Sequence, residues 1–339
     1  NSEDMSRIDD EIITILKKEG AKSGSEIARM LGVSRQAINK HLILLIEDNK
    51  VKKTGKTRAA KYILYNKKRA NIKYKKKYII KGLKEHEVFN EISMILNVKN
   101  VLNNNVFDIL EYGFTEMLNN AIEHSHSLKC DVLLELNQYK FTFEIRDYGI
   151  GIFESIKNKF NLKTEVDSIG LLIKGKLTTL PDRHSGEGIF FTSKSGDYFK
   201  IRSHSTTLIF DNNKKDIFVE RSKKINGTGI TFTIRNASRK ALKKIFDEFA
   251  SEKYDFKFFK TEIYVKLISE SFMSRSEARR LLIGADKFKE IILDFKGVKI
   301  IGQGFADEIF NIYKNLHPDI MINIVNANLE INEMIKHVS

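Results

Sequence analysis

The middle of this 339-residue chain contains two side chains whose spacing could serve phosphate chemistry. Glu116 and Asn120 are four residues apart, so a helix would place a carboxylate and a carboxamide on the same face. Such a pair could orient a water molecule and hold a magnesium ion beside a phosphate chain. The pair alone is common, and two solvated side chains would account for it equally well, so its meaning depends on the segments that follow.

Asp147 begins a D-x-G-x-G motif with Gly149 and Gly151, directly after a predicted strand over residues 139–146. The two glycines let the chain turn sharply, because glycine adopts backbone conformations that other residues avoid. The turn would leave the Asp147 carboxylate pointing into a pocket, where an exocyclic amine could donate a hydrogen bond to it.

Two further glycine-rich segments follow. Gly186 and Gly188 precede an apolar helix start, where backbone N–H groups and the helix dipole would suit a phosphate. Thr228 lies between two glycines at the start of a predicted strand over residues 230–234. Each segment alone is weak evidence for a ligand site, and their joint occurrence in this order is stronger.

The four segments, over roughly residues 85–237, resemble the Bergerat ATP-binding fold shared by gyrase-type ATPases, Hsp90-type chaperones, histidine kinases and anti-sigma-factor serine kinases. The resemblance implies an α/β sandwich that binds ATP with Mg²⁺. It implies that Asn120 coordinates magnesium and that Glu116 is the general base. Asp147 would accept a hydrogen bond from the adenine amine, and Thr228 would support that contact. The two glycine boxes would be formed by Gly149, Gly151, Gly186 and Gly188.

Two further residues bear on the branch of this superfamily. Histidine kinases carry a phosphorylatable histidine in a helical hairpin, and too few residues follow His86 to complete such a hairpin. The short second glycine box looks more like that of the anti-sigma serine kinases, but Glu187 between its glycines departs from the pattern. A carboxylate there would weaken binding of a triphosphate unless it points away. ATP hydrolysis, transfer to a protein and sensing without turnover therefore all stay open.

The net charge of +14 is concentrated at the amino-terminal end of the chain. Residues 1–84 hold 22 lysines and arginines against 9 acidic residues, which leaves the remainder close to neutral. A basic segment joined to a neutral body indicates a polyanion-binding module attached to a part that does different work.

Apolar spacing within this basic segment predicts three short helices and a hairpin. Gly20 would close the first helix, Ser25 would cap the second and Ser34 would cap the third. Two predicted strands then flank a lysine-rich loop. This order of elements over residues 5–66 resembles a winged helix-turn-helix domain, and residues 67–84 are predicted to be a basic linker.

A winged helix-turn-helix domain places its third helix in the major groove of double-stranded DNA. The resemblance therefore implies base and phosphate contacts from the outward residues of that helix, and phosphate contacts from the wing. These residues are Arg35, Gln36, Asn39 and Lys40 on the helix and Lys52, Lys53 and Lys56 on the wing. A winged helix that binds protein instead of DNA stays as the alternative.

The carboxy-terminal part, residues 257–339, follows a predicted linking helix within residues 238–256. Ser274 and Glu277 have capping-box spacing, and the order of strand, turn, helix and strand predicts a small α/β layer. This part resembles the STAS-like domains related to anti-anti-sigma proteins, whose turn carries a phosphorylatable serine. The corresponding turn, Gly302 to Gly304, holds no hydroxyl. We therefore expect it to dock a protein partner or the ATPase domain, with a purely architectural cap as the alternative.

The expected fold class is a multidomain α+β protein: a winged helix-turn-helix, a Bergerat α/β sandwich and a small STAS-like α/β domain. Because no apolar run is long enough to span a membrane, we expect a cytoplasmic protein with no membrane partner. The leading hypothesis is an ATP-responsive regulator that binds double-stranded DNA, with homodimerisation left open. The alternatives are an anti-sigma-type serine/threonine kinase and a nucleotide-gated scaffold of a multi-protein system, such as a defence system. The single cysteine, Cys130, is expected to be a buried apolar residue.

Overall fold

The computed structural model of the chain describes residues 2–47, 50–55, 60–64, 72–175, 187–250, 258–267 and 272–338. The chain divides into two compact units, of which the first comprises residues 1–72 with residues 136–139 and the second comprises the rest. Among the helices within the described ranges, none is long and apolar enough to cross a membrane.

The amino-terminal unit is a cluster of three helices with a two-stranded antiparallel hairpin. Its elements are α1 (Ser2–Glu19), α2 (Gly24–Leu31), α3 (Arg35–Glu47), β1 (Val51–Thr54) and β2 (Lys61–Leu64). Gly20, with a φ of +75°, follows α1, and α3 begins where Ser34 Oγ accepts a hydrogen bond from Ala37 N at 3.2 Å. Both boundaries agree with the sequence prediction. Apolar residues from all three helices and the hairpin are buried together, among them Ile12, Ile27, Ile38, Leu42 and Val51.

The start of α2 corrects the predicted cap. Ser23 is the N-cap residue, and Ser25 lies within the helix. Ser23 Oγ accepts a hydrogen bond from Glu26 N at 3.3 Å, and the Glu26 carboxylate accepts one from Ser23 N at 2.7 Å. This reciprocal capping box satisfies two backbone donors, whereas the residue three positions after Ser25 is an alanine.

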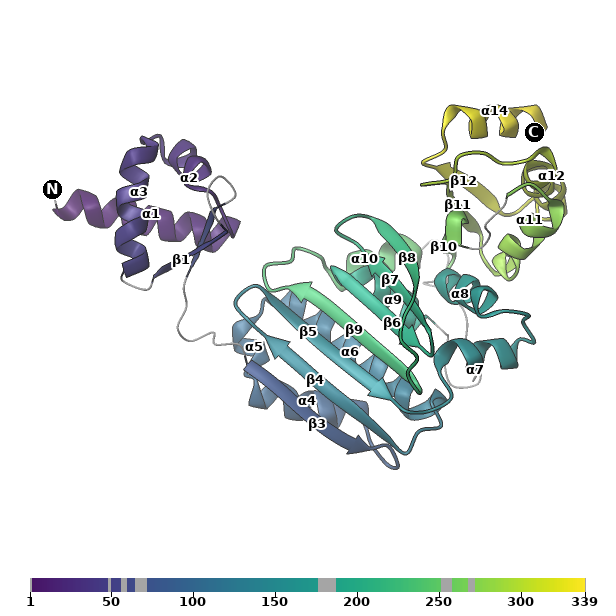
Figure 1. Cartoon of the computed structure of the whole chain (residues 1–339), viewed down its shortest axis with the longest axis horizontal. Coiled ribbons are helices and arrows are strands. Elements are labelled where there is room, and N and C mark those ends of the chain that lie inside the picture. The colour runs from purple at the N-terminus through teal and green to yellow at the C-terminus, as the bar shows by residue number, and fades with distance from the viewer. Residues whose placement is uncertain are drawn as a thin grey trace. The chain divides into compact units, whose positions relative to one another are not determined.

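Seven strands form the main sheet of the larger unit. In spatial order they are β3 (Ile72–Ile79), β4 (Lys129–Leu136), β5 (Lys140–Asp147), β9 (Thr228–Arg235), β6 (Tyr198–Ser203), β7 (Thr206–Asp211) and β8 (Asp216–Arg221). From β5 onward each neighbouring pair is antiparallel. Figure 1 shows one face of the sheet covered by α4 (Glu85–Ile95), α5 (Val98–Val101) and α6 (Asn104–His124). Phe114 of α6 packs edge-on against Phe143 of β5 at 5.5 Å, so the core of this α/β sandwich lies between α6 and the sheet.

Strand β3 corrects the middle of the predicted basic linker over residues 67–84, of which residues 67–71 lie outside the described part of the chain. Residues 72–79 pair with β4 as an edge of the sheet. The hydroxyls of Tyr74 and Tyr78 both donate to the Glu91 carboxylate of α4, at 3.0 and 3.2 Å, and Lys76 forms an ion pair with the same carboxylate at 2.7 Å. Lysines along an edge strand also discourage pairing with another chain, so a high lysine content does not by itself indicate a linker.

The remaining helices of the sandwich lie between β5 and β6 and after β9. They are α7 (Ile152–Lys159), α8 (Glu165–Lys174), α9 (Gly188–Ser195) and α10 (Leu242–Phe249). The helix predicted within residues 238–256 is thus present as α10, and residues 251–257 lie outside the described part of the chain.

The carboxy-terminal part is a parallel three-stranded sheet with helices, which agrees with the small α/β layer predicted from the sequence. Its main elements are β10 (Lys260–Tyr264), α11 (Arg275–Leu282), β11 (Glu290–Asp294), α12 (Gln303–Asp307), β12 (Met321–Val325) and α14 (Leu329–Val338). The capping box of Ser274 and Glu277 at the start of α11 is confirmed. The glycine turn packs within the carboxy-terminal part itself: Gly302 N donates to Phe272 O at 2.8 Å, and a Cβ at Gly302 would lie 2.6 Å from Met273 O.

The sandwich and the carboxy-terminal part, predicted as separate domains over residues 85–237 and 257–339, share one hydrophobic core. Phe190 of α9 packs against Phe249 of α10 at 5.0 Å and against Phe258 at 4.5 Å. Phe258 in turn packs against Phe288 of the carboxy-terminal part at 5.2 Å. A helix pattern shows that a face is apolar but not which distant element covers it, so the sequence did not reveal this joint core.

Candidate functional site

A cavity of about 430 Å³ lies in the larger unit, where α6, α7, α9 and the adjoining ends of β5 and β9 meet. It is lined by six of the eight residues that the sequence predicts for ligand binding, namely Glu116, Asn120, Asp147, Gly151, Gly188 and Thr228. These residues come from segments up to 112 positions apart in the chain. Gly149 lies in the turn that shapes the wall, and Gly186 falls outside the described residues.

Asp147 is fixed at the end of β5 by backbone donors. It is 4% exposed, and its Oδ1 accepts hydrogen bonds from Gly149 N at 2.9 Å and Thr228 N at 3.1 Å. Burial raises the pKa of Asp147, and the hydrogen bonds to Gly149 and Thr228 partly oppose that rise. The Thr228 hydroxyl also accepts from Ile152 N at 3.0 Å, so this threonine joins the start of β9 to the start of α7.

The first glycine box is required by the path of the chain. A Cβ at Gly149 would collide with the carbonyl group of Ser125, which accepts a hydrogen bond from Ile150 N at 3.0 Å. The end of α6 and the turn after β5 therefore touch through their backbones. Only glycine permits this approach, which brings Ser125 and Asp147 to the same wall of the cavity.

The second glycine box shows a similar contact. A Cβ at Gly188, the first residue of α9, would collide with the Glu116 carboxylate. Glu116 therefore lies against the amino-terminal end of α9, and Glu187 also lines the cavity. Burial, followed by the charges of Glu116 and Glu187, raises the pKa of Tyr112 beside them. This side of the cavity is acidic. Glu187, which departs from the glycine-box pattern of the resembled family, therefore adds to the negative charge here.

Apolar side chains complete the cavity. Ile145, Ile156, Leu172, Phe191 and Ile230 line it together with the polar residues above. A concave site with an apolar lining and a few fixed polar groups is typical of small-molecule binding.

Three further residues line the cavity that the sequence analysis did not predict, namely Tyr112, Ser125 and Phe246. Tyr112 precedes Glu116 by one helical turn, so its spacing could have indicated it, whereas Phe246 belongs to a distant helix.

The donor set fits magnesium only with help from a ligand. Within the part of the chain that the structure describes, no group of three or more His, Cys, Asp or Glu side chains could hold a metal ion. Mg²⁺ commonly keeps several waters and binds through one or two protein groups plus substrate phosphates. Asn120 and Glu116, one turn apart on α6 and both lining the cavity, fit that kind of site.

Cys130 is fully buried in β4, as expected from the sequence. Burial raises the pKa of its thiol to about 12. The thiolate needed for nucleophilic attack is therefore scarce at neutral pH, and Cys130 is a packing residue.

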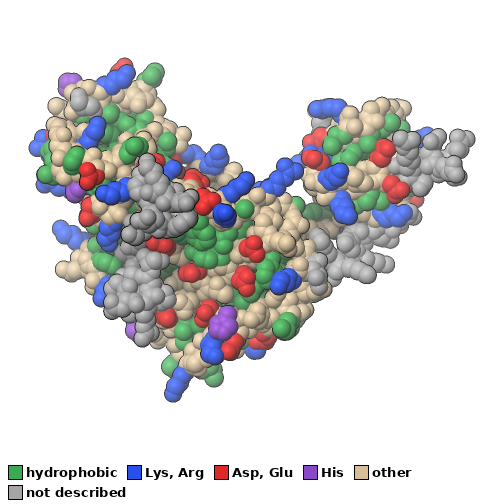
Figure 2. Space-filling model, turned by 180° about the vertical axis from the view of Figure 1, so that it is seen from behind, with side chains coloured by type: hydrophobic (Ala, Val, Ile, Leu, Met, Phe, Trp, Pro, Cys, Tyr) green, Lys and Arg blue, Asp and Glu red, His purple; other side chains and the backbone are tan. Residues whose placement is uncertain are grey.

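The predicted DNA-contact residues of the amino-terminal unit are exposed. Arg35, Gln36, Asn39 and Lys40 are exposed on α3, and Lys52 and Lys53 are exposed on β1, while Lys56 lies outside the described residues. His41, on the buried side of α3, contacts Asp9 of α1 at 2.9 Å between Nδ1 and Oδ1. The buried side thus fixes α3 in its unit and leaves the predicted contact residues accessible. Figure 2 shows charges of both signs interspersed over one face of the larger unit.

Comparison with protein families identifies the two ends of the chain. Residues 5–52 match the family model described as winged helix-turn-helix DNA-binding, and residues 277–332 match a STAS-like domain of unknown function (DUF4325). Searches of curated proteins and of solved structures gave no match. The chain therefore carries an amino-terminal winged helix-turn-helix domain and a carboxy-terminal STAS-like domain, and the first of these indicates a DNA-binding regulator.

Proposed function

We propose that this chain is a DNA-binding regulator whose middle domain binds ATP with Mg²⁺ and thereby alters how the winged helix engages double-stranded DNA. The observation that carries the proposal is the convergence of Glu116, Asn120, Asp147 and Thr228 on one cavity of about 430 Å³. Side chains chosen only for their motif spacing would not be expected to line the same cavity by accident.

The fixed carboxylate of Asp147 supports recognition of adenine. Two backbone N–H groups hold its Oδ1 at 2.9 and 3.1 Å, which orients the carboxylate before a ligand arrives. A preoriented acceptor loses little entropy on binding, and a hydrogen bond to a charged group contributes about 1.5–3 kcal/mol. Ile145 and Ile230, beside it in the lining, offer apolar contacts to a flat base.

The acidic end of the cavity supports a requirement for a divalent cation. Glu116 and Glu187 both line this end, and a triphosphate placed beside two carboxylates would be repelled without a cation between them. Magnesium supplies that positive charge when bound. Asn120 would hold the ion together with the phosphates, and Glu116 would accept a proton from an attacking water if ATP is hydrolysed.

The test compares Asp147→Asn with Asp131→Asn on the full chain. Asparagine at 147 retains an oxygen for the two backbone donors but replaces the acceptor facing the ligand, so calorimetry should show Mg²⁺-ATP binding weakened about 10- to 150-fold. Asp131 accepts from the Tyr148 hydroxyl at 2.7 Å and does not line the cavity, so its variant should bind like the parent. Equal affinities for the parent and Asp147→Asn would contradict the adenine site.

The regulatory half of the proposal needs a second measurement. DNA affinity of the full chain should differ with and without Mg²⁺-ATP in gel-shift titrations at one fixed salt concentration. Asp147→Asn should abolish that difference while leaving DNA affinity in the absence of nucleotide unchanged. If saturating Mg²⁺-ATP leaves the DNA affinity unchanged, the chain binds nucleotide and DNA independently, and the regulatory half of the proposal is wrong.

A further inference from the structure

Two helices that wall the cavity are held from their far side by the STAS-like domain. Helix α8 contributes Leu172 to the cavity, and α9 contributes Gly188 and Phe191. Both helices also pack against the carboxy-terminal part of the chain, so each has one side toward the cavity and another toward the STAS-like domain. A movement of that domain would therefore move the cavity wall.

The contact at α9 combines aromatic packing with an ion pair between Lys194 and Glu262 of β10. Phe191, which lines the cavity, packs against Phe258 at 5.3 Å, and its neighbour Phe190 packs against Phe258 at 4.5 Å. Phe258 reaches Phe288 in the core of the STAS-like domain at 5.2 Å. One chain of rings thus runs from the cavity wall to that core.

The contact at α8 is polar and involves both ends of the helix. At its amino-terminal end, Arg280 of α11 forms an ion pair with Asp167 and donates to the Thr164 hydroxyl at 3.1 Å. Asp167 and Thr164 form the capping box of α8, so Arg280 binds the two residues that stabilise the start of this helix. At the other end, Lys174 Nζ donates to Ile283 O at 2.8 Å, directly after α11.

Lys174 is almost completely enclosed at this junction. It is 2% exposed, and the hydroxyl of Thr261 in β10 donates to its backbone carbonyl at 2.7 Å. Burial lowers the pKa of Lys174 to about 7. The burial of Lys174 and its hydrogen bond to Ile283 O place its side chain between α8 and the end of α11.

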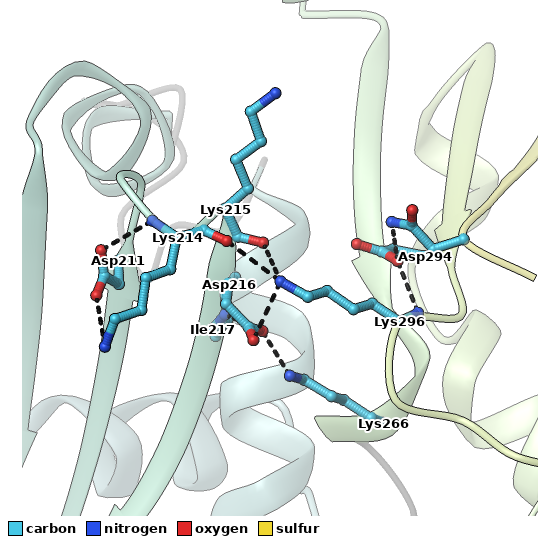
Figure 3. A network of polar contacts seen from close by, with 9 residues as sticks. Asp211, Lys214, Lys215, Asp216, Ile217, Lys266, Asp294 and Lys296 are labelled. Carbon is cyan, nitrogen blue, oxygen red and sulfur yellow. Dashed lines mark hydrogen bonds and ion pairs between the residues drawn. The ribbon is translucent and has the colours of Figure 1, made fainter.

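A second attachment lies away from the cavity. Figure 3 shows Lys266 and Lys296 of the STAS-like domain meeting Asp216 at the start of β8, at 2.5 and 3.2 Å. Lys296 Nζ also donates to the carbonyls of Lys214 and Lys215 at 3.2 and 2.9 Å. None of these residues lines the cavity, so this attachment can keep the domain in place when the contacts at α8 are cut.

We infer that the STAS-like domain sets the ligand affinity of the cavity, by holding α8 through Arg280 and so fixing the wall that α8 and α9 form. This inference rests on the proposed nucleotide site for its ligand. Linkage makes the effect reciprocal, since a ligand that favours the docked arrangement also strengthens docking. A partner protein that loosens α11 from α8 would then release the ligand.

The experiment compares Arg280→Ala with Arg279→Ala in the full chain. Arg279 is the neighbouring residue of α11, but its guanidinium pairs with Glu308 inside the STAS-like domain at 2.8 Å. By calorimetry, Arg280→Ala should weaken Mg²⁺-ATP binding at least 5-fold, the lower end of typical coupling between sites. Arg279→Ala should stay within twofold of the parent. Equal affinities for the two variants would overturn the inference.

Hydrogen exchange separates this inference from the nucleotide assignment. If the parent binds no Mg²⁺-ATP, the proposed function fails. The hydrogen-exchange rates of the backbone amides of residues 165–175 and 187–195 then test whether the STAS-like domain controls the cavity wall. Faster exchange there in Arg280→Ala than in Arg279→Ala would support control of the wall by the domain, and equal exchange would refute it. Should Arg280→Ala fail to fold, Arg280→Lys keeps the charge but loses the second donor, and it should give a smaller loss in the same direction.

Discussion

Replacing Gly149 by alanine tests the close approach that shapes the cavity. A Cβ at Gly149 would lie well inside 3.0 Å of the Ser125 carbonyl group, a separation that Cβ atoms do not adopt. That carbonyl would have to move and lose the hydrogen bond it accepts from Ile150 N at 3.0 Å. One lost hydrogen bond costs about 0.5–1.5 kcal/mol, and overpacking costs about 1–3 kcal/mol. Gly149→Ala should therefore lower the free energy of unfolding by about 1.5–4.5 kcal/mol.

The control is alanine at Gly229, which belongs to another predicted glycine segment. A Cβ at Gly229 would meet Ile225 Cδ1 at 3.9 Å and Arg202 O at 4.0 Å, which are ordinary contacts. Its variant should change stability by less than about 1 kcal/mol. Urea denaturation followed by circular dichroism measures both. If Gly149→Ala unfolds at the same urea concentration as Gly229→Ala, the Ser125 carbonyl does not approach Gly149, and the reasoning about this wall is wrong.

Two further predictions concern charge. Because burial lowers the pKa of Lys174 to about 7 from its ordinary 10.5, the unfolded chain binds more protons than the folded chain between these values. The free energy of unfolding should therefore rise with pH across that window, and Lys174→Met should reduce the rise in urea melts at pH 7 and 9. For DNA, alanine at Arg35 and Asn39 should remove sequence preference while general affinity remains. Alanine at Lys52 and Lys53 should weaken binding to all DNA duplexes alike and reduce the slope of log affinity against log salt by about 2. An unchanged slope would show that these lysines do not contact phosphate.

Local chemistry made much of the fold predictable. The cap at Ser34, the capping box at Ser274 and the glycine after α1 all mark helix ends that depend on neighbouring backbone donors and acceptors. Ser25 is a good cap residue by type, but the S-x-x-E spacing of Ser23 and Glu26 indicates the correct cap of α2.

The composition of a segment misled where the structure depends on pairing. Residues 72–79 were predicted to be a linker because they are rich in lysine. Their tyrosines nevertheless alternate with lysines at the strand period, and Tyr74 and Tyr78 meet Glu91 of a helix that follows in the chain. A count of charges cannot see that contact, whereas the period of two could have indicated a strand.

The polar residues of the candidate site could be predicted from the sequence because each belongs to a local motif. The apolar residues that form the walls of the cavity could not. Asp147 and Glu116 occupy the cavity because glycines at 149 and 188 admit the backbone or carboxylate that lies against them, and a motif records such local constraints. Phe191 lines the same cavity while it packs against Phe258 and the core of the STAS-like domain, which no local motif in the sequence records. Burial of the apolar rings stabilises the contact but does not fix the orientation of the two parts, because the hydrophobic effect is non-directional. The ion pair of Arg280 with Asp167 in the first turn of α8 is directional, and it therefore restricts that orientation. A site whose polar groups are set locally and whose walls are set by a second domain can keep its chemistry while its affinity changes. This arrangement is what the proposed control of the cavity by the STAS-like domain requires.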